Sequence, residues 1–395
     1  MPAESLNPVS DLAGFTRRNG IQSILWLGTT FDEAVTQTRR AISPAASRWQ
    51  SQMVKALRKC GVTVRMLGHI PEPAWPRGAL FVDAAEPGDH DLSVVPYMNA
   101  PGLRLYSLSE AYLRHARPYL KSGNPPDAVV SYNTAPQVWR IGSFAKSLGI
   151  PWIALVADAP SRFPQRQFHD LVASAADGRV YLSWFEGQRA REPKLHLDGG
   201  IDLVPHRAKP ARQKCPAVLY SGTLSRYGGV NLLLRAFALI RDPEAELWIC
   251  GKGSRADLGV WAQDPRIKFL GYVSEERLND LSRNCWVFVN PRPSDISENR
   301  SNFPSKLLHY LSYSKPVIST WTDGLSPDYK SVLLVLDDET PQCLAHAIEQ
   351  VFSWNADQYA AVAEQIEAFV ERGHSWEDQA ARLLDWINRE CMHPN

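Results

Sequence analysis

The chain contains Arg300-Ser-Asn-Phe-Pro-Ser-Lys-Leu-Leu-His-Tyr-Leu-Ser-Tyr-Ser-Lys-Pro-Val-Ile-Ser319, which predicts a loop, a short helix, a tight turn and a buried strand in succession. Pro304 suits the first position of a helix, because its missing N–H would have no partner there in any case. Ser301 or Asn302 is expected to cap the free amides. A helix start of this kind presents unpaired N–H groups and a partial positive charge, so it attracts phosphate, and Lys306 adds a full charge.

This stretch resembles a signature of GT-B glycosyltransferases, in the family 4-like group that uses nucleoside-diphosphate sugars. The signature reads Phe-Pro-Ser-Lys-x-x-Glu-Tyr-x-x-x-x-x-Pro-Val-Ile, and His309 stands where the family usually has Glu. Many family members carry another Glu eight positions earlier, where this chain has Ser301, so both acids are replaced. Glu298 is close enough in sequence to contact the sugar instead. The resemblance implies that the nucleotide-sugar is bound by Ser305, Lys306, Leu307 and His309.

Strands and helices alternate from end to end, which predicts an α/β chain, and 395 residues suffice for two domains. The resemblance implies a GT-B fold, with two Rossmann-like domains whose parallel sheets face a central cleft. The predicted domains are residues 1–205 on the acceptor side and residues 206–372 for the nucleotide-sugar. Residues 373–395 are expected to form a helix that crosses back to the first domain. Residues 205–216 predict the linker, because cations alternate there with prolines.

Apolar runs predict the strands, and helical periodicity predicts the helices between them. Residues 71–101 are rich in Pro, Gly and Asp and predict an irregular surface loop. The predicted strands are residues 21–27, 62–67, 128–132, 152–156, 218–220, 246–250, 267–270, 286–289 and 316–319, and the predicted helices are residues 45–59, 136–148, 231–240 and 376–389.

The segment from Ser221 to Phe237 predicts a strand end, a glycine-bearing turn and a helix. Gly222 suits a place where the backbone approaches a phosphate closely. The segment resembles the diphosphate-binding stretch of the same family, although Thr223 replaces the usual Arg and Gly228 the usual Lys. The charge is then expected from Arg226 or Lys306. A generic βα turn is the alternative interpretation.

A second resemblance covers Gly271-Tyr272-Val273, which follows a strand and precedes a helix. In the family the backbone of this loop contacts the nucleotide base, so the resemblance implies the same contact here. Ser274 is a good N-cap for the helix, although Arg277 rather than Glu occupies the third helical position. Structural capping is the alternative for these residues.

The first half carries weaker signals. Asp158 ends the strand of residues 152–156 and resembles the Asp of a His-Asp pair in many GT-B enzymes, with Ala157 in place of the His. A carboxylate there is a candidate general base for the acceptor hydroxyl, and helix capping is the alternative. Asn133 and Gly28-Thr29 also follow strands and are candidates to contact sugar or acceptor. Surface charge is the main interpretation of Arg39, Arg40 and Arg48, with an acidic acceptor as the alternative.

The composition favours some classes of binding partner and cellular location over others. The net charge of +1 argues against nucleic acid. The six cysteines form no Cys-x-x-Cys pair, which favours a reduced, cytoplasmic protein without a zinc site. Asp89-His-Asp91 imitates a metal motif but follows no apolar strand, so we predict no metal and no cofactor. The N-terminus has no signal-peptide pattern. Arg114–Lys121 and 13 tryptophans leave open a peripheral contact at the inner face of the membrane, with a solvated helix face as the alternative.

The predicted function is a metal-independent glycosyltransferase that moves a sugar from a nucleoside-diphosphate sugar, with UDP favoured, to a hydroxyl of a glycan or lipid-linked acceptor. The resemblance favours a retaining mechanism and a role in polysaccharide or envelope assembly, and inversion stays open because the Glu pair is replaced. A non-catalytic protein that binds nucleotide-sugar is the alternative. A UDP-sugar epimerase is a weaker one, because the first half lacks the required set of acids and histidine.

Overall fold

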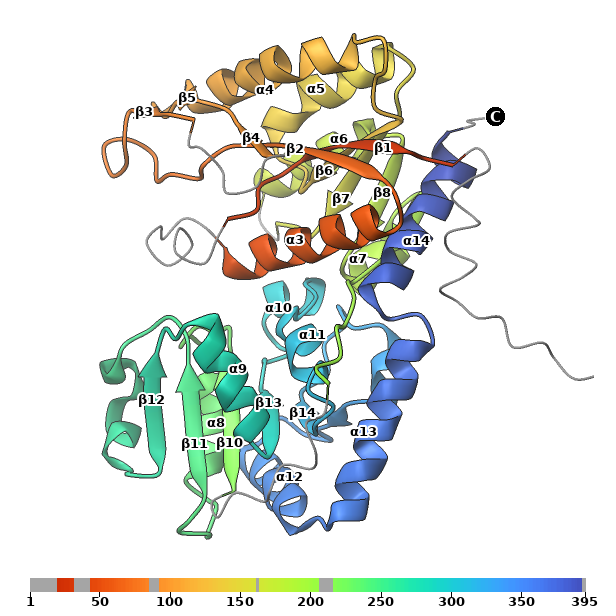
Figure 1. The fold of residues 1–395 in the computed structure, drawn as a ribbon. Helices are drawn as coiled ribbons and strands as arrows, with labels where there is room; N and C mark the ends of the chain where they lie inside the picture. The colour runs from red at the N-terminus through yellow and green to blue at the C-terminus, as the bar shows by residue number, and fades with distance from the viewer. Residues whose placement is uncertain (1–19, 32–42, 85–91, 161–162, 206–215, 393–395) are drawn as a thin grey trace, which may run out of the picture. The chain divides into compact units, whose positions relative to one another are not determined.

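The structure, a computed structural model, describes residues 20–31, 43–84, 92–160, 163–205 and 216–392. The chain divides into two compact units, and each contains its own parallel sheet (Figure 1). The first unit comprises Met1–Leu182, Glu186–Gly200 and Trp376–Asn395, and the second comprises Ser183–Phe185 and Ile201–Ser375. The predicted α/β class with two parallel sheets is therefore confirmed.

The first unit has a seven-stranded sheet in the order β4-β2-β1-β6-β7-β8-β9, and every neighbouring pair is parallel. Its central strands are nearly continuous apolar runs, as expected of strands that are covered on both faces; all five residues of β7 are buried. The strands are β1 Ser23–Leu27, β2 Thr63–Gly68, β4 Leu92–Val94, β6 Ala128–Tyr132, β7 Trp152–Val156, β8 Gly178–Tyr181 and β9 Lys194–His196.

Helices connect these strands. The first begins after Ser43, whose hydroxyl accepts a hydrogen bond from the amide of Ala46 while Pro44 occupies the first helical position. The helix predicted over residues 136–148 is confirmed as α5, which joins the parallel neighbours β6 and β7 in a βαβ crossover. The helices of this part of the chain are α3 Pro44–Lys59, α4 Arg104–Leu120, α5 Pro136–Ser147, α6 Gln165–Ala175 and α7 Trp184–Arg189.

The prediction of an irregular loop over residues 71–101 is wrong in part. Residues of β4 extend the parallel sheet beside β2, and β3 (Phe81–Val82) pairs with β5 (Tyr97–Met98) in a separate two-stranded antiparallel sheet. These strands have two or three residues each, too few for a periodic signal in the sequence.

The last helix, α14 (Trp376–Trp386), belongs to the first unit and continues into a π-helical turn at Ile387–Cys391. It packs against α3, where the rings of Trp49 and Trp376 meet edge to face with centroids 5.6 Å apart. A methyl group at Gly178 on β8 would lie 2.6 Å from Cys391 Sγ, so Cys391 packs directly on the sheet.

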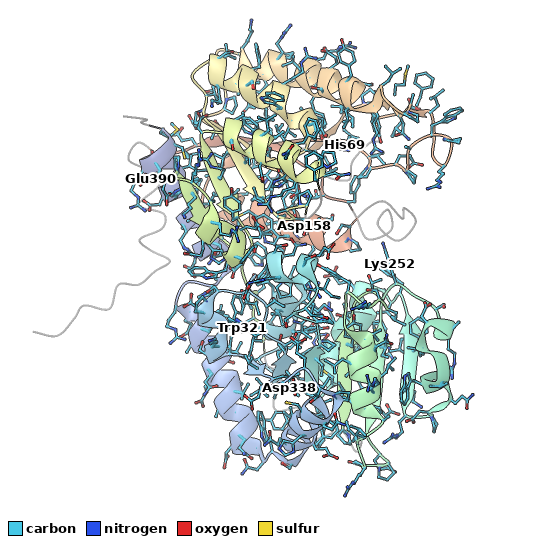
Figure 2. All side chains as sticks on the ribbon, turned by 180° about the vertical axis from the view of Figure 1, so that it is seen from behind. His69, Asp158, Lys252, Trp321, Asp338 and Glu390 are labelled. Carbon is cyan, nitrogen blue, oxygen red and sulfur yellow. The ribbon has the colours of Figure 1, made fainter. Side chains whose placement is uncertain are left out.

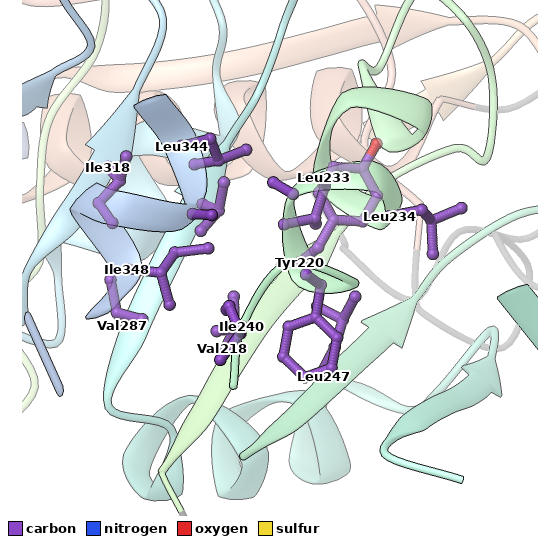
Figure 3. Close-up of a cluster of buried hydrophobic side chains, with 14 of the residues drawn as sticks. Val218, Tyr220, Leu233, Leu234, Ile240, Leu247, Val287, Ile318, Leu344 and Ile348 are labelled. Carbon is purple, nitrogen blue, oxygen red and sulfur yellow. The ribbon is translucent and has the colours of Figure 1, made fainter. Parts of the chain in front are cut away.

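The second unit has a six-stranded parallel sheet in the order β12-β11-β10-β13-β14-β15. Its core gathers apolar side chains from these strands, α8 and α12, including Val218, Leu233, Leu247 and Ile348 (Figure 3). The strands are β10 Ala217–Ser221, β11 Glu246–Cys250, β12 Ile267–Gly271, β13 Val287–Asn290, β14 Val317–Ser319 and β15 Leu334–Val335.

The helical elements of this unit complete the alternation. They are α8 Val230–Phe237, the 3₁₀ segment η1 Arg255–Gln263, α9 Glu275–Asn284, α10 Ser297–Ser301, α11 Lys306–Leu311, the 3₁₀ segment η2 Pro327–Ser331, α12 Pro341–Ser353 and α13 Ala356–Glu371.

Lys315 closes the C-terminal end of α9. Its buried ammonium donates hydrogen bonds to the carbonyl oxygens of Ser282 (3.1 Å), Arg283 (2.5 Å) and Cys285 (2.6 Å). A cation at this end satisfies carbonyl groups that have no partner within the helix and complements the helix dipole. Burial lowers the pKa of Lys315.

Candidate functional site

Parallel strands of the second unit end at one edge of the sheet, and their following loops are joined by backbone hydrogen bonds. The amide of Gly222 donates to the carbonyl of Cys250 (2.8 Å), and the amide of Gly251 donates to that of Gly271 (2.8 Å). A methyl group at Gly251 would lie 1.9 Å from the carbonyl oxygen of Gly222. The glycines therefore let the loops after β10, β11 and β12 lie close together, at the edge where open α/β sheets bind ligands.

Tyr220 shapes the loop between β10 and α8. The ring is fully buried, and its hydroxyl faces the carbonyl oxygens of Thr223 (3.0 Å) and Gly228 (3.3 Å), to which it donates (Figure 3). A methyl group at Gly228 would lie 2.3 Å from this hydroxyl. Gly228 is therefore needed for the close approach of the loop to the ring, which is a structural reason for glycine at the position where relatives are expected to carry Lys.

The structure brings Lys306 to this loop. Its Nζ lies 4.4 Å from the centroid of the Tyr220 ring, in a cation–π contact. A methyl group at Gly222 would lie 2.9 Å from the same nitrogen, so the absence of a side chain at Gly222 gives the ammonium its space. Two predicted site residues, 84 positions apart in the sequence, therefore meet.

The surroundings of Lys306 disfavour the charged form of its side chain. Burial, and then the positive charge of Arg292, lower its pKa to about 7. Among the residues that the structure describes, no carboxylate forms an ion pair with Lys306. An anionic ligand would stabilise the protonated form of such a half-buried lysine beside another cation, because the ligand replaces the hydration that burial removes.

Arg292 is the residue of this site that the sequence analysis missed. It follows β13 within Asn290-Pro-Arg-Pro, is 6% exposed, and lies with its guanidinium carbon 4.3 Å from the Tyr227 ring centroid. Its Nε donates to Asn299 Oδ1 (2.5 Å). Asn299 in turn donates to the carbonyls of Tyr227 (3.0 Å) and Pro293 (2.8 Å). An arginine directly after a buried strand, between prolines that exclude a helix, was the available signal.

The prediction of an unpaired helix start at Pro304 is wrong. Helix α11 begins at Lys306 and has six residues, and Ser305 at its N-cap makes no side-chain cap. The amides of Leu307 and Leu308 already donate to the carbonyls of Pro304 (3.0 Å) and Ser305 (3.2 Å). These tight turns occupy the amides of Leu307 and Leu308, which would otherwise be available to a phosphate, and so short a helix has a small dipole.

The expected caps of this helix are also wrong. Ser301 ends α10 and donates to the carbonyl of Ser297 (3.3 Å) instead. Asn302 lies between the two helices, and its buried Oδ1 has no hydrogen-bond partner within the described residues. Both side chains therefore leave the start of α11 uncapped.

The other two residues expected near the sugar make internal contacts. The Nε2 atom of His309 lies 3.2 Å from Ser282 Oγ, and its ring meets that of Tyr313 edge to face. Glu298 on α10 accepts a hydrogen bond from Ser297 Oγ (2.9 Å). His309 thus links α11 to α9, whatever else it binds.

Arg226 lies apart from the buried cations. Its side chain is 83% exposed, and its Nη2 is 3.9 Å from Asp295 Oδ2. An exposed pair of this kind contributes little to stability. A role for Arg226 at a diphosphate therefore stays a prediction, as does that of Lys306, and Arg292 is a further cation that is buried near Lys306.

The loop expected to contact a base follows β12. Gly271 has a φ angle of +67°, and a methyl group there would meet nothing within 4 Å. Tyr272 is 43% exposed and Val273 is half-buried. Ser274 caps α9 as predicted, because its hydroxyl accepts from the amide of Arg277 (3.2 Å).

In the first unit, Asn133 follows β6 and Asp158 follows the neighbouring strand β7. Figure 2 labels Asp158. Asn133 Oδ1 accepts hydrogen bonds from the amides of Ala157 (3.0 Å) and Asp158 (3.2 Å). Asn133 has a φ angle of +64°, which asparagine tolerates better than most residues. The Asp158 side chain is exposed. The pKa of Tyr132 is raised first by the burial of its own hydroxyl and then by the negative charge of Asp158.

Gly28 and Thr29 follow β1. A methyl group at Gly28 would lie 2.0 Å from Gln50 Oε1, and Gln50 Nε2 donates to the carbonyl of Thr29 (3.1 Å). The Thr29 hydroxyl donates to the carbonyl of His69 (3.2 Å). Burial, and then the charge of Arg104, lower the pKa of His69 to about 4, so this imidazole is neutral at physiological pH. The sequence did not point to His69, which is labelled in Figure 2.

Several other predictions cannot be placed. Asp89-His-Asp91, Arg39, Arg40 and residues 206–215 lie outside the described residues, whereas Arg48 is exposed on α3. Within the described parts of the chain, no group of three or more His, Cys, Asp or Glu residues could hold a metal ion. No helix in those parts is long and apolar enough to cross a membrane.

Residues 215–353 match the family model described as glycosyl transferases group 1. This segment contains Gly222, Arg292, Lys306 and the loop at Gly271, so the residues brought together above lie inside the matched part. The match confirms the predicted resemblance to glycosyltransferases over this part of the chain. No curated protein sequence matches the chain.

Solved structures resemble the chain over nearly its whole length. Sucrose-phosphate synthase from Thermosynechococcus elongatus has a TM-score of 0.68 at 17% identity, over 92% of this chain and 97% of that one. A glycosyltransferase from Rickettsia africae has 0.67 at 14%, over 96% and 100%. Anabaena HepE, in complex with UDP and glucose, has 0.63 at 15%, over 93% and 99%. The predicted GT-B fold is confirmed by these likenesses.

Proposed function

We propose, from the group 1 glycosyltransferase match over residues 215–353, that the chain transfers a sugar from a nucleoside-diphosphate sugar to a hydroxyl group of a glycan or lipid-linked acceptor. The donor lies on the second unit, with its diphosphate at the corner formed by Gly222, Lys306 and Arg292. The base lies on the loop of Gly271, Tyr272 and Val273.

One observation carries this proposal. The Lys306 ammonium lies beside Gly222 at a strand end, and Arg292 is close enough for its charge to lower the pKa of Lys306. Cations held in a partly dry place interact strongly with a diphosphate and need no rearrangement as charge develops on the leaving group. The alternative of a generic βα turn explains Gly222 but not the two cations.

UDP is the favoured nucleotide. The support comes from two of the similar structures, HepE in complex with UDP and glucose and a UDP-forming trehalose-phosphate synthase from Burkholderia xenovorans, which has a TM-score of 0.60 at 10% identity. Neither fixes the sugar, which we leave unspecified.

For the chemical step, we assign the leaving diphosphate to Lys306 and Arg292, with no metal and no cofactor. Asp158 is the proposed general base, with its backbone held by Asn133. Gly28, Thr29, Glu298 and Ser301 remain candidates for sugar or acceptor contacts. A retaining mechanism is favoured, and inversion is the alternative because Ser301 and His309 occupy the places of the expected acids.

The proposed acceptor belongs to polysaccharide or envelope assembly. A similar structure, the lipopolysaccharide outer core galactosyltransferase WaaB, has a TM-score of 0.58 at 16% identity and supports this choice. We propose a cytoplasmic protein that works at the inner face of the membrane.

A second candidate is a non-catalytic protein that binds a nucleotide-sugar. It is favoured by the internal hydrogen bonds of Ser301 to Ser297 and of His309 to Ser282, because both side chains are engaged within the protein. A binding protein and an enzyme share the diphosphate corner, so only turnover separates them.

The test is a thermal-shift screen of the full chain with UDP and GDP, followed by an assay for donor hydrolysis and transfer. A ligand that binds only the folded protein raises its melting temperature, and we expect UDP to do so. Lys306→Met should abolish the shift, whereas Lys268→Met, on an exposed lysine of the same unit, should keep it. An equal shift in both variants would place the diphosphate elsewhere. Binding without hydrolysis or transfer would favour the non-catalytic candidate.

A further inference from the structure

Asn299 connects two loops that contribute to the diphosphate corner of the second unit. Its side chain, on α10, is fully buried. The side-chain amide donates hydrogen bonds to the carbonyl of Tyr227 (3.0 Å), in the loop between β10 and α8, and to that of Pro293 (2.8 Å), in the loop after β13. Its Oδ1 accepts a hydrogen bond from Nε of Arg292 (2.5 Å). The side chain is therefore committed to contacts within the protein.

The Arg292 guanidinium is held on two sides. Its Nε is bound by Asn299, and its central carbon lies 4.3 Å from the centroid of the Tyr227 ring, in a cation–π contact. Its charge lies close enough to Lys306 to lower the pKa of that lysine. A long side chain that is fixed before a ligand arrives loses little further rotamer freedom on binding. Contacts that fix Arg292 therefore favour the binding of an anion at this corner.

The same two loops also meet through their backbones. Gly229, at the start of α8, has a φ angle of +75°, and a methyl group there would lie 1.7 Å from the carbonyl oxygen of Pro291. Arg292 follows directly, so it reaches the loop between β10 and α8 from a different strand. That loop has Thr223 and Gly228 where the family resemblance implies cations, and the loop after β13 brings a positive charge to it.

We propose that Asn299 is a positioning residue for the nucleotide-sugar: it holds the Arg292 guanidinium where the diphosphate binds and does not contact the nucleotide-sugar itself. A side chain with no exposed surface and three internal hydrogen bonds cannot reach a ligand without a rearrangement. The inference rests on the proposed function, because it takes this corner as the diphosphate site. It adds a residue whose effect on affinity passes through Arg292.

A purely structural role is the alternative. Asn299 would then stabilise the junction of the two loops, and its loss would lower the free energy of unfolding without acting on Arg292 in particular. The two roles differ in one measurable respect. If Asn299 acts through Arg292, its removal changes little once the guanidinium is gone, so the effects of the two substitutions on affinity are not additive.

The experiment is a double-mutant cycle on the full chain, with isothermal titration calorimetry of UDP as the measurement. Asn299→Ala should weaken UDP binding about tenfold, because the guanidinium loses its fixed orientation. Arg292→Met should weaken it at least as much, since a charged contact is lost. In the Arg292→Met background, Asn299→Ala should change the dissociation constant by less than about twofold.

A second variant covers the case in which Asn299→Ala does not fold. Tyr227→Leu removes the ring beside the guanidinium at a position that is 38% exposed, where a substitution costs less stability than in the core. It should weaken UDP binding about threefold or more. This effect should also disappear in the Arg292→Met background.

Two measurements separate positioning from a general loss of structure. Uridine has no phosphate, so it should bind equally to Asn299→Ala and to the natural sequence, whereas a collapsed loop would weaken the binding of both uridine and UDP. The matched control is Asn355→Ala, which removes a hydrogen-bonded asparagine that caps α13 in the same unit. This control should lower the melting temperature and keep the affinity for UDP.

Additive effects in both cycles, or an equal loss of uridine and UDP binding in Asn299→Ala, would overturn the proposal. An unchanged UDP affinity in folded Asn299→Ala would do the same. If the natural sequence bound no UDP, the diphosphate corner itself would be wrong and both proposals would fail. UDP binding with additive cycles would remove only the role of Asn299.

Discussion

Nucleotide affinity should depend on pH through Lys306. In the protein without ligand its pKa is lowered to about 7 by burial and by Arg292, so the side chain loses its proton as pH rises above neutrality. A bound diphosphate favours the protonated form. Binding is therefore coupled to uptake of one proton, and affinity must fall as pH rises through and above 7.

The size of the effect follows from the proton linkage. Each pH unit above the pKa of the ligand-free protein costs about 1.4 kcal/mol of binding free energy. From pH 7 to 8.5 the dissociation constant for UDP should therefore rise by more than tenfold, towards a limit of about thirtyfold. The terminal phosphate of UDP is almost fully ionised across this range, because its pKa is near 6, so the ligand contributes little to the slope.

Isothermal titration calorimetry with UDP across this pH range measures the effect, and buffers of different ionisation enthalpy report the proton uptake. The control is Lys306→Arg, because a guanidinium keeps its charge throughout; its affinity should be nearly independent of pH. Lys306→Met should bind weakly at every pH. A flat profile for the natural sequence, or the same slope in Lys306→Arg, would refute the role of the Lys306 proton.

Three further predictions test other parts of the structure. Lys315→Met should lower the free energy of unfolding by about 2–4 kcal/mol, because three carbonyls lose a charged donor. The control Lys268→Met should change it by less than about 0.5 kcal/mol. Urea denaturation measures both variants, and equal values would show that the three hydrogen bonds of Lys315 contribute nothing to stability. Gly222→Ala should weaken UDP binding about tenfold, since the added methyl displaces the Lys306 ammonium; calorimetry showing unchanged affinity would contradict this placement. Asp158→Asn should reduce sugar transfer by about a hundredfold or more with unchanged UDP affinity if its carboxylate is the base, and intact turnover in a steady-state assay would remove that assignment.

The elements that the sequence predicted best are those that depend on local pattern. The strands at residues 128–132, 152–156 and 246–250 begin and end where the apolar runs do, because central parallel strands bury every residue. The short strands β3, β5 and β9 were not predicted. They have two or three residues each, and their pairing is fixed by distant partners rather than by composition.

The site also has residues that the local pattern predicted and contacts that only the folded structure reveals. The motif singled out Gly222 and Lys306, but their contact over the Tyr220 ring depends on how β10 and α11 lie in the folded unit. The same dependence hid Arg292, since a buried arginine looks like a surface residue until its ring and amide partners are known. The helix start at Pro304 was wrong because local turns take up the amides, a choice that propensity does not reveal.

The return of α14 to the first unit has a consequence for biosynthesis. Trp376 packs against Trp49, and Cys391 lies against Gly178 on β8, so the first unit, most of which is synthesised before the second, lacks part of its interior until residues 376–391 have been made. Its sheet must wait with an uncovered apolar side while the whole second unit is synthesised. Nascent chains stalled before residue 376 should therefore be more sensitive to protease in the first unit than in the second. Removal of residues 376–395 should likewise destabilise the first unit, although most of that unit is far from them in the sequence.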